Sequence, residues 1–166
     1  MGGLSKKSAA LKLALAAVVV LLVSVSAALA EELTRAEYVE RVEPICKSNT
    51  EANSRILKGV KQQVQRDELM TAGKRFIRAS QALGTAVKQI ARVPRPAEDV
   101  VKLTKWIGYL QIEQRYLLKI GKALKARNKF RAQKYSVELN RNNNRANNTV
   151  ISFGFHECRI DSSKFL

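Results

Sequence analysis

Residues 67–93 read DELMTAGKRFIRASQALGTAVKQIARV, and this stretch decides the fold. Its apolar and small residues recur every three or four positions, at Leu69, Gly73, Phe76, Ser80, Leu83, Val87 and Ile90. That spacing places them on one face of an α-helix, which must be covered by other helices. Val93-Pro94-Arg95-Pro96 follows and ends the helix, because each proline bars the preceding residue from helical geometry.

The same spacing predicts a helix before this stretch. Thr34-Arg35-Ala36-Glu37 is a capping box and marks its start. The expected inner face contains Tyr38, Val42, Ile45, Asn49, Asn53, Ile56, Val60 and Val64. Pro44 lacks a backbone N–H, so we expect either a kink there or a short helix that ends near Val42.

Two further helices are expected after the prolines. The third opens at Glu98 and Asp99, and its expected inner face contains Leu103, Ile107, Leu110, Gln114, Leu117, Gly121 and Leu124. The fourth is expected to bury Ala132, Tyr135, Leu139, Asn143, Ala146, Val150 and Phe153, before a stop at Gly154. Strand and hairpin signals are lacking, and short connections make neighbouring helices antiparallel. The sequence therefore predicts an all-α protein, an up-down-up-down antiparallel four-helix bundle over residues 31–166.

Residues 1–30 have the pattern of an export leader. Three lysines, Lys6, Lys7 and Lys12, precede an uncharged run over 13–30 that ends in Ala28-Leu29-Ala30. This pattern is typical of a signal peptide. The alternative is an uncleaved membrane anchor, because 18 residues of helix span about 27 Å. Either interpretation places the domain over 31–166 outside the cytoplasm, secreted or membrane-anchored.

The two cysteines fit the expected bundle. Phe153 should arrive beside the residues near 41 of the first helix, and the turn at Gly154 then brings Cys158 back toward Cys46. Export to an oxidising space favours a Cys46–Cys158 disulfide. The alternative is two buried free thiols.

Several short motifs resemble a known group of proteins. They are Glu37-Tyr38, Ile45-Cys46-Lys47 with Asn49 after it, and Phe153-Gly154-Phe155 before Cys158. Over residues 33–158 the chain resembles small exported actinobacterial proteins with a signal or lipoprotein leader, a helical body and two end-to-end cysteines. It departs from them in lacking a lipoprotein cysteine and in being strongly basic. The resemblance implies the fold and the location, and it implies no particular activity.

Charge is the main functional indication. The chain has 30 Lys and Arg against 14 Asp and Glu, a net charge of +16. In the expected bundle, residues 58–78 and 119–134 lie at the same end, which we call the basic pole. Its thirteen basic residues are Lys58, Lys61, Arg66, Lys74, Arg75, Arg78, Lys119, Lys122, Lys125, Arg127, Lys129, Arg131 and Lys134, and its two acidic residues are Asp67 and Glu68. Such a pole predicts binding to a polyanion: a phosphate-bearing wall polymer, an anionic lipid surface or extracellular nucleic acid, without sequence-specific readout.

Catalytic chemistry is not indicated. His156 stands alone, and no nucleophile motif, phosphate loop, cofactor signature or set of metal ligands is present. We therefore expect a non-enzymatic, monomeric accessory or binding protein of the cell envelope. The alternative is a structural or inhibitor-like bundle that binds one specific protein partner, with charge serving solubility only. Asn49, Asn53 and Asn143 are expected either to fix the helix register by mutual hydrogen bonds or to form a small-ligand site.

Overall fold

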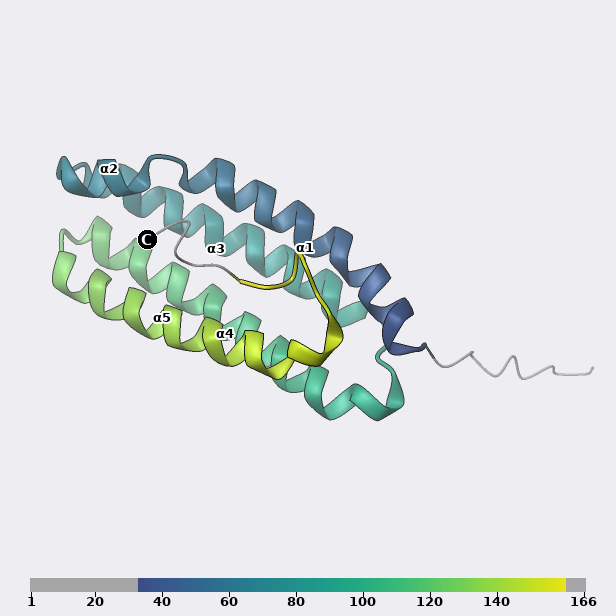
Figure 1. Ribbon diagram of the computed structural model, residues 1–166. Helices are drawn as coiled ribbons and strands as arrows, with labels where there is room; N and C mark the ends of the chain where they lie inside the picture. The colour runs from purple at the N-terminus through teal and green to yellow at the C-terminus, as the bar shows by residue number, and fades with distance from the viewer. Residues whose placement is uncertain (1–32, 161–166) are drawn as a thin grey trace, which may run out of the picture. The chain divides into compact units, whose positions relative to one another are not determined.

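The computed structural model describes residues 33–160, and these form helices joined by short turns (Figure 1). The four long helices are α1 (Arg35–Leu57), α3 (Leu69–Arg92), α4 (Val100–Lys125) and α5 (Lys129–Thr149). Three short elements accompany them: α2 (Val60–Gln65), the 3-10 turn η1 (Ala97–Asp99) and the 3-10 turn η2 (Ile151–Phe153). The all-α prediction is confirmed for this part of the chain, and the predicted leader over 1–30 lies outside the described residues. None of the described helices is both long and apolar enough to cross a membrane.

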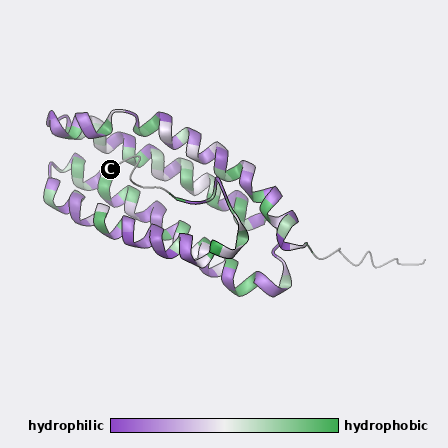
Figure 2. Ribbon diagram, in the orientation of Figure 1, coloured by the Kyte–Doolittle hydropathy of each residue, from purple (hydrophilic) through white to green (hydrophobic). Residues whose placement is uncertain are grey.

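The long helices pack mainly on their neighbours in sequence. α1 and α2 pack against α3, α3 against α4, and α4 against α5 (Figure 1). Hydrophobic residues alternate with hydrophilic ones along each helix, as Figure 2 shows, because each helix buries only one side. η2 contacts both α1 and α5, so the segment after α5 links the first and last helices of the domain.

α3 and α4 form the central pair. Every residue expected on the inner face of α3, from Leu69 to Ile90, is buried. Gly73 and Gly121 face each other across this pair. A Cβ atom on Gly73 would lie 2.6 Å from the carbonyl oxygen of Gly121, and one on Gly121 would lie 2.7 Å from the carbonyl oxygen of Gly73. The two backbones are therefore too close to accommodate a Cβ atom between them, and only glycine fits at either position.

α1 continues through Pro44, so the expectation of a short helix ending near Val42 is wrong. Pro44 and Glu40 are both exposed, which lets water hydrate the Glu40 carbonyl that Pro44 leaves without a donor. The helix instead ends at Leu57, because Gly59 adopts a left-handed conformation with φ of +78°. α2 then continues in the same region and buries Val60.

An ion pair joins the start of α1 to the start of α4. Arg35 donates from Nε and Nη2 to the two carboxylate oxygens of Asp99, at 2.7 and 2.9 Å. Asp99 is only 1% exposed, and the paired, bidentate geometry compensates its carboxylate for lost hydration. The Arg35 guanidinium also lies 5.0 Å from the ring centroid of Phe153 in η2. This contact places the end of α5 beside the beginning of α1.

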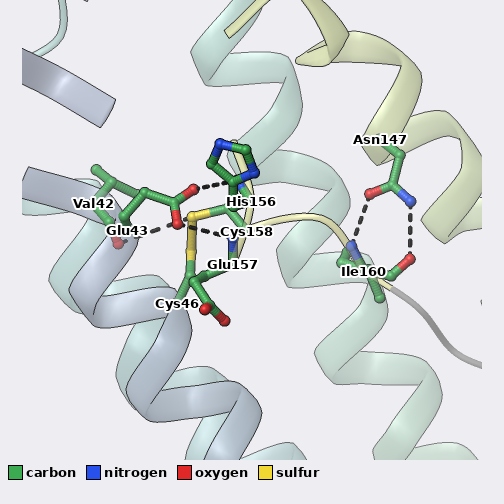
Figure 3. Close-up of a disulfide and its surroundings, with 8 residues drawn as sticks. All are labelled: Val42, Glu43, Cys46, Asn147, His156, Glu157, Cys158 and Ile160. Carbon is green, nitrogen blue, oxygen red and sulfur yellow. Dashed lines mark hydrogen bonds between the residues drawn. A yellow bond between two sulfur atoms is a disulfide. The ribbon is translucent and has the colours of Figure 1, made fainter. Parts of the chain in front are cut away.

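Residues 151–160, which we call the strap, run back along α1 after a left-handed turn at Gly154 (Figure 1). Cys158 forms the predicted disulfide with Cys46 of α1 (Figure 3), and the two Cα atoms lie 5.0 Å apart. The Glu43 carboxylate accepts hydrogen bonds from the backbone N–H groups of His156 and Glu157, at 2.7 and 2.8 Å. The strap is therefore fixed to α1 by one covalent bond and by two charge-assisted hydrogen bonds.

The strap is also fixed to α5 and α4. The Asn147 side chain donates to the backbone carbonyl of Ile160 and accepts from its N–H, each at 2.9 Å (Figure 3). Phe155 stacks on the indole of Trp106, with ring centroids 5.2 Å apart. The strap thus fills the space between α1 and α5, which have little direct contact of their own within the described residues.

The glycine crossing predicts opposite effects for two glycine-to-alanine substitutions. Gly73→Ala should lower the free energy of unfolding by about 1 to 3 kcal/mol, because its Cβ would overlap the backbone of α4. Gly108→Ala is the matched control on α4, since a Cβ there meets no atom within 4 Å. It should raise the free energy of unfolding by up to about 1 kcal/mol through better helix propensity. Urea unfolding at neutral pH measures both, and equal effects of the two variants would contradict the close crossing.

Candidate functional site

The two turns of the predicted basic pole lie together. Asp67, in the turn before α3, accepts from Arg127 Nη2 at 2.5 Å and from Lys129 Nζ at 2.8 Å. Arg127 lies in the turn between α4 and α5, and Lys129 is the first residue of α5. Asp67 and Arg127 both have positive φ, +62° and +55°, so each supplies the left-handed residue of its turn. These contacts join the turn before α3 to the turn between α4 and α5.

Both acidic residues of the pole are engaged. The hydrogen bond from Lys129 is the main cause that lowers the pKa of Asp67. The hydrogen bond from Arg66, at 2.7 Å, likewise lowers the pKa of Glu68. Both carboxylates therefore stay ionised at neutral pH, and they form ion pairs with three cations, Arg66, Arg127 and Lys129. The other ten basic residues of the pole form no ion pair within residues 33–160.

The structure does not gather all thirteen cations into one site. Four of them line a shallow, open groove of about 580 Å³ along α3, with Lys125 at the end of α4 as its one residue from the second helix. We call it the α3–α4 groove, and its lining residues are Thr71, Lys74, Arg75, Ile77, Arg78, Gln81 and Lys125. The glycine crossing shapes it, because the Lys125 side chain packs directly over Gly73. Arg75 is held in place by a hydrogen bond to the carbonyl of Lys58 at the end of α1.

The remaining cations have other surroundings. Lys119 lies over the rings of Tyr116 and Tyr135, 5.3 and 5.5 Å from their centroids, on the side formed by α4 and α5. Lys61 and Lys129 border a second groove, of about 360 Å³, whose floor includes Phe76, Ile120 and Leu124. This second groove is mainly apolar, so the pole offers hydrophobic surface as well as charge.

Phe130 is an exposed aromatic residue of the basic pole. It lies outside the inner face predicted for its helix, and its side chain is 81% exposed at the start of α5. Its neighbours in sequence, Lys129 and Arg131, are also exposed. Met70, at the start of α3, is 49% exposed near the same turns. The pole therefore presents an aromatic and a thioether side chain among its cations.

The asparagines are only partly as expected. Asn53 donates from Nδ2 to Asn49 Oδ1 at 3.3 Å, within α1. Asn143 forms no bond to either, and both polar atoms of its amide are buried without a partner among the described residues. The expected register bond between helices is made instead by Asn142, which donates to the Tyr109 carbonyl of α4 at 2.9 Å.

Sequence reasoning missed Glu113, the most unusual titratable group. The predicted inner face of the helix contained Gln114 and not Glu113, yet Glu113 is only 9% exposed and Gln114 is half-buried. Burial raises the pKa of Glu113 from 4.5 to about 8. The sequence does indicate that Glu113 lies on the apolar face of the helix, because Glu113 follows Leu110 by three positions and precedes Leu117 by four. A carboxylate at that spacing on an apolar face is a buried acid.

Glu113 predicts a specific dependence of stability on pH. The pKa of Glu113 is raised on folding. Its contribution to the free energy of unfolding is therefore fully present below about pH 4.5 and is lost as the pH rises toward 8. Over that window wild type should lose stability relative to Glu113→Gln, by at most about 1.4 kcal/mol per pH unit. Urea unfolding between pH 5 and 8 measures the difference. Glu98→Gln, at an exposed carboxylate, is the control, and its difference in stability from wild type should not change in this way with pH. If both variants differ from wild type by the same pH-dependent amount, Glu113 is not the source of the effect.

Taken together, the basic pole can attract anions over a broad surface and can place apolar groups beside them. Among residues 33–160, no group of three or more His, Cys, Asp or Glu side chains could hold a metal ion. No protein-family model, curated protein sequence or solved structure is significantly similar to this chain.

Proposed function

We propose that this is an exported, non-enzymatic protein of the cell envelope that docks on an anionic lipid surface through its basic pole. The observation that carries the proposal is the exposed Phe130, which lies between Lys129, paired with Asp67, and Arg131, which forms no ion pair within residues 33–160. Charge alone is common on soluble proteins, and an exposed Phe beside Lys and Arg adds the apolar contact that basic proteins use to bind at a membrane interface.

The energetics favour a lipid surface. Each Lys or Arg near an anionic membrane contributes about 1 kcal/mol, and inserting a Phe side chain contributes about 1.5 to 3 kcal/mol. A few of the ten unpaired cations together with Phe130 therefore suffice for reversible docking. The basic pole lies at one end of the long helices, so the domain would stand end-on with the α4–α5 turn against the headgroups.

Export is supported by the leader pattern of residues 1–30 and by the likeness to small exported actinobacterial proteins. The Cys46–Cys158 disulfide is compatible with an oxidising, extracytoplasmic location. The leader, whether cleaved or retained as an anchor, would deliver the domain to the outer side of the membrane whose lipids it then contacts.

One observation favours a second target, a phosphate-bearing wall polymer. The α3–α4 groove contains Lys74, Arg75, Arg78 and Lys125 and no carboxylate. A groove suits an extended anionic chain better than a flat surface does. Binding there would depend on charge alone and would be independent of Phe130.

Vesicle binding with a matched pair of variants tests the lipid proposal. Wild type should bind phosphatidylglycerol-containing vesicles, should not bind pure phosphatidylcholine vesicles, and should dissociate as salt rises. Phe130→Ser should weaken binding about tenfold or more, the fold-change that corresponds to losing at least about 1.4 kcal/mol. Ile151→Ser removes an equally exposed apolar side chain from η2 and should leave binding unchanged.

Retention on polyphosphate separates the two targets. The triple variant Lys74→Gln, Arg78→Gln, Lys125→Gln removes three charges from the groove, and Lys88→Gln, Arg92→Gln, Lys105→Gln removes three exposed charges elsewhere on α3 and α4. Suppose that wild type and the second triple variant are retained on polyphosphate in a salt-sensitive way, that the first triple variant is not, and that wild type does not bind vesicles. The target would then be the polymer and not the lipid. Absence of salt-sensitive binding to either target would leave the alternative of one protein partner, with charge serving solubility.

A further inference from the structure

A partly open cavity of about 80 Å³ lies beneath the strap and shares no lining residue with the two grooves of the basic pole. Its walls come from α1, α3, α4 and the strap, and its lining residues are Cys46, Asn49, Thr50, Asn53, Leu83, Ala86, Ile90, Leu110, Glu113, Glu157, Cys158, Arg159 and Ile160. The disulfide and the Glu43 and Asn147 hydrogen bonds hold the strap over it, so the cavity is preformed.

Two buried oxygen atoms of this cavity have no hydrogen-bond partner within the described residues. They are Glu113 Oε2, on α4, and Asn53 Oδ1, on α1. Glu113 is 9% exposed and Asn53 is 7% exposed. The Asn53 amide nitrogen is already bonded to Asn49, which leaves its oxygen as an acceptor. A buried acceptor without a donor is costly, by about 1 to 3 kcal/mol for a neutral group and more for a carboxylate.

Once Glu113 is ionised, its oxygen and Asn53 Oδ1 are both acceptors, so a partner that binds both must supply hydrogen-bond donors. From these contacts we propose that the cavity binds the protonated amino group of a short primary alkylamine, with the ammonium between Glu113 Oε2 and Asn53 Oδ1. An ammonium group has three donors and no acceptor, and its charge matches a carboxylate. The alkyl part lies against Leu83, Ile90 and Leu110.

The size and the charges of the cavity restrict the ligand. At roughly 30 Å³ for each water-sized group, 80 Å³ admits about three non-hydrogen atoms, so the terminal methyl group of a propyl chain would lie in the mouth of the cavity. A metal ion is disfavoured, because the described residues offer no cluster of three suitable ligands. Besides Glu113, the charged groups that line the cavity are Glu157 and Arg159, both on the strap.

Protonation of Glu113 competes with the amine. The carboxyl is neutral in the empty cavity at neutral pH, since burial raises its pKa to about 8. The ionised fraction, and with it the affinity, should rise about tenfold from pH 7 to pH 9, where an alkylamine is still protonated. The side chain that binds the ligand thus also determines the pH at which it binds.

Titration by NMR with propylammonium chloride in 150 mM salt tests the proposal. The expected result is saturable binding at pH 9, about tenfold weaker at pH 7, with shifts in the backbone resonances around Asn53 and Glu113. Two probes serve as ligand controls: 1-propanol, of the same length without charge, and tetramethylammonium, which is charged but has no N–H donor. Neither should saturate the site.

Three variants complete the test. Glu113→Gln should weaken propylammonium binding at least tenfold and remove its pH dependence, whereas Asn53→Ala should weaken binding and retain the pH dependence. Glu98→Gln removes a charge outside the cavity and should bind as wild type does. The proposal is overturned by equal binding of 1-propanol, by unchanged binding in a folded Glu113→Gln protein, or by no saturable binding at either pH, which would mean that water fills the cavity.

Discussion

The disulfide between Cys46 and Cys158 is the constraint on which the domain depends most. It closes a loop that reaches from the middle of α1 to the end of the strap, a separation of 112 residues. In the chain-entropy view, so long a loop contributes about 4 to 5 kcal/mol to stability. Its structural effect is more specific, because it keeps the strap between α1 and α5. These two helices have little direct contact, and the strap packs between them instead. Glu43 and Asn147 then fix the strap's backbone from either side.

The central pair α3 and α4 provides the second constraint. The glycine crossing brings the two backbones together near the basic pole, so the cations of α3 and α4 share one groove. The ion pairs of Asp67 then hold the two turns of the pole together. One end of the domain therefore combines unpaired cations with an exposed Phe130, whereas the strap covers an enclosed carboxyl near the disulfide. The proposed surface-docking role and the proposed amine site rest on these separate features and can fail separately.

The helical periodicity predicted most of the fold. The inner face of α3 and the disulfide pairing both follow from spacing and from antiparallel connections, which are local rules. The path of α1 did not follow, because the solvent-exposed position of Pro44 and the left-handed Gly59 depend on surroundings that a sequence does not display.

The site was harder to predict than the fold. The sequence predicted that the two turns lie together. It could not predict which cations pair with Asp67 and Glu68, because this depends on the positions of the side chains in the folded protein. Glu113 was missed because of a one-residue ambiguity in the apolar face of α4, where Gln114 was expected. Such an ambiguity is settled only by packing, where a shift of one residue rotates a side chain by about 100° around the helix axis.

The most direct test of this account is hydrogen–deuterium exchange on the oxidised protein and on the protein after reduction of its disulfide. The account predicts that reduction speeds exchange at the backbone N–H groups of His156, Glu157 and Ile160, while the buried centre of α3 and α4 remains protected. Uniform loss of protection across all helices, or unchanged protection of the strap, would contradict the claim that this bond holds the strap over an independently packed core.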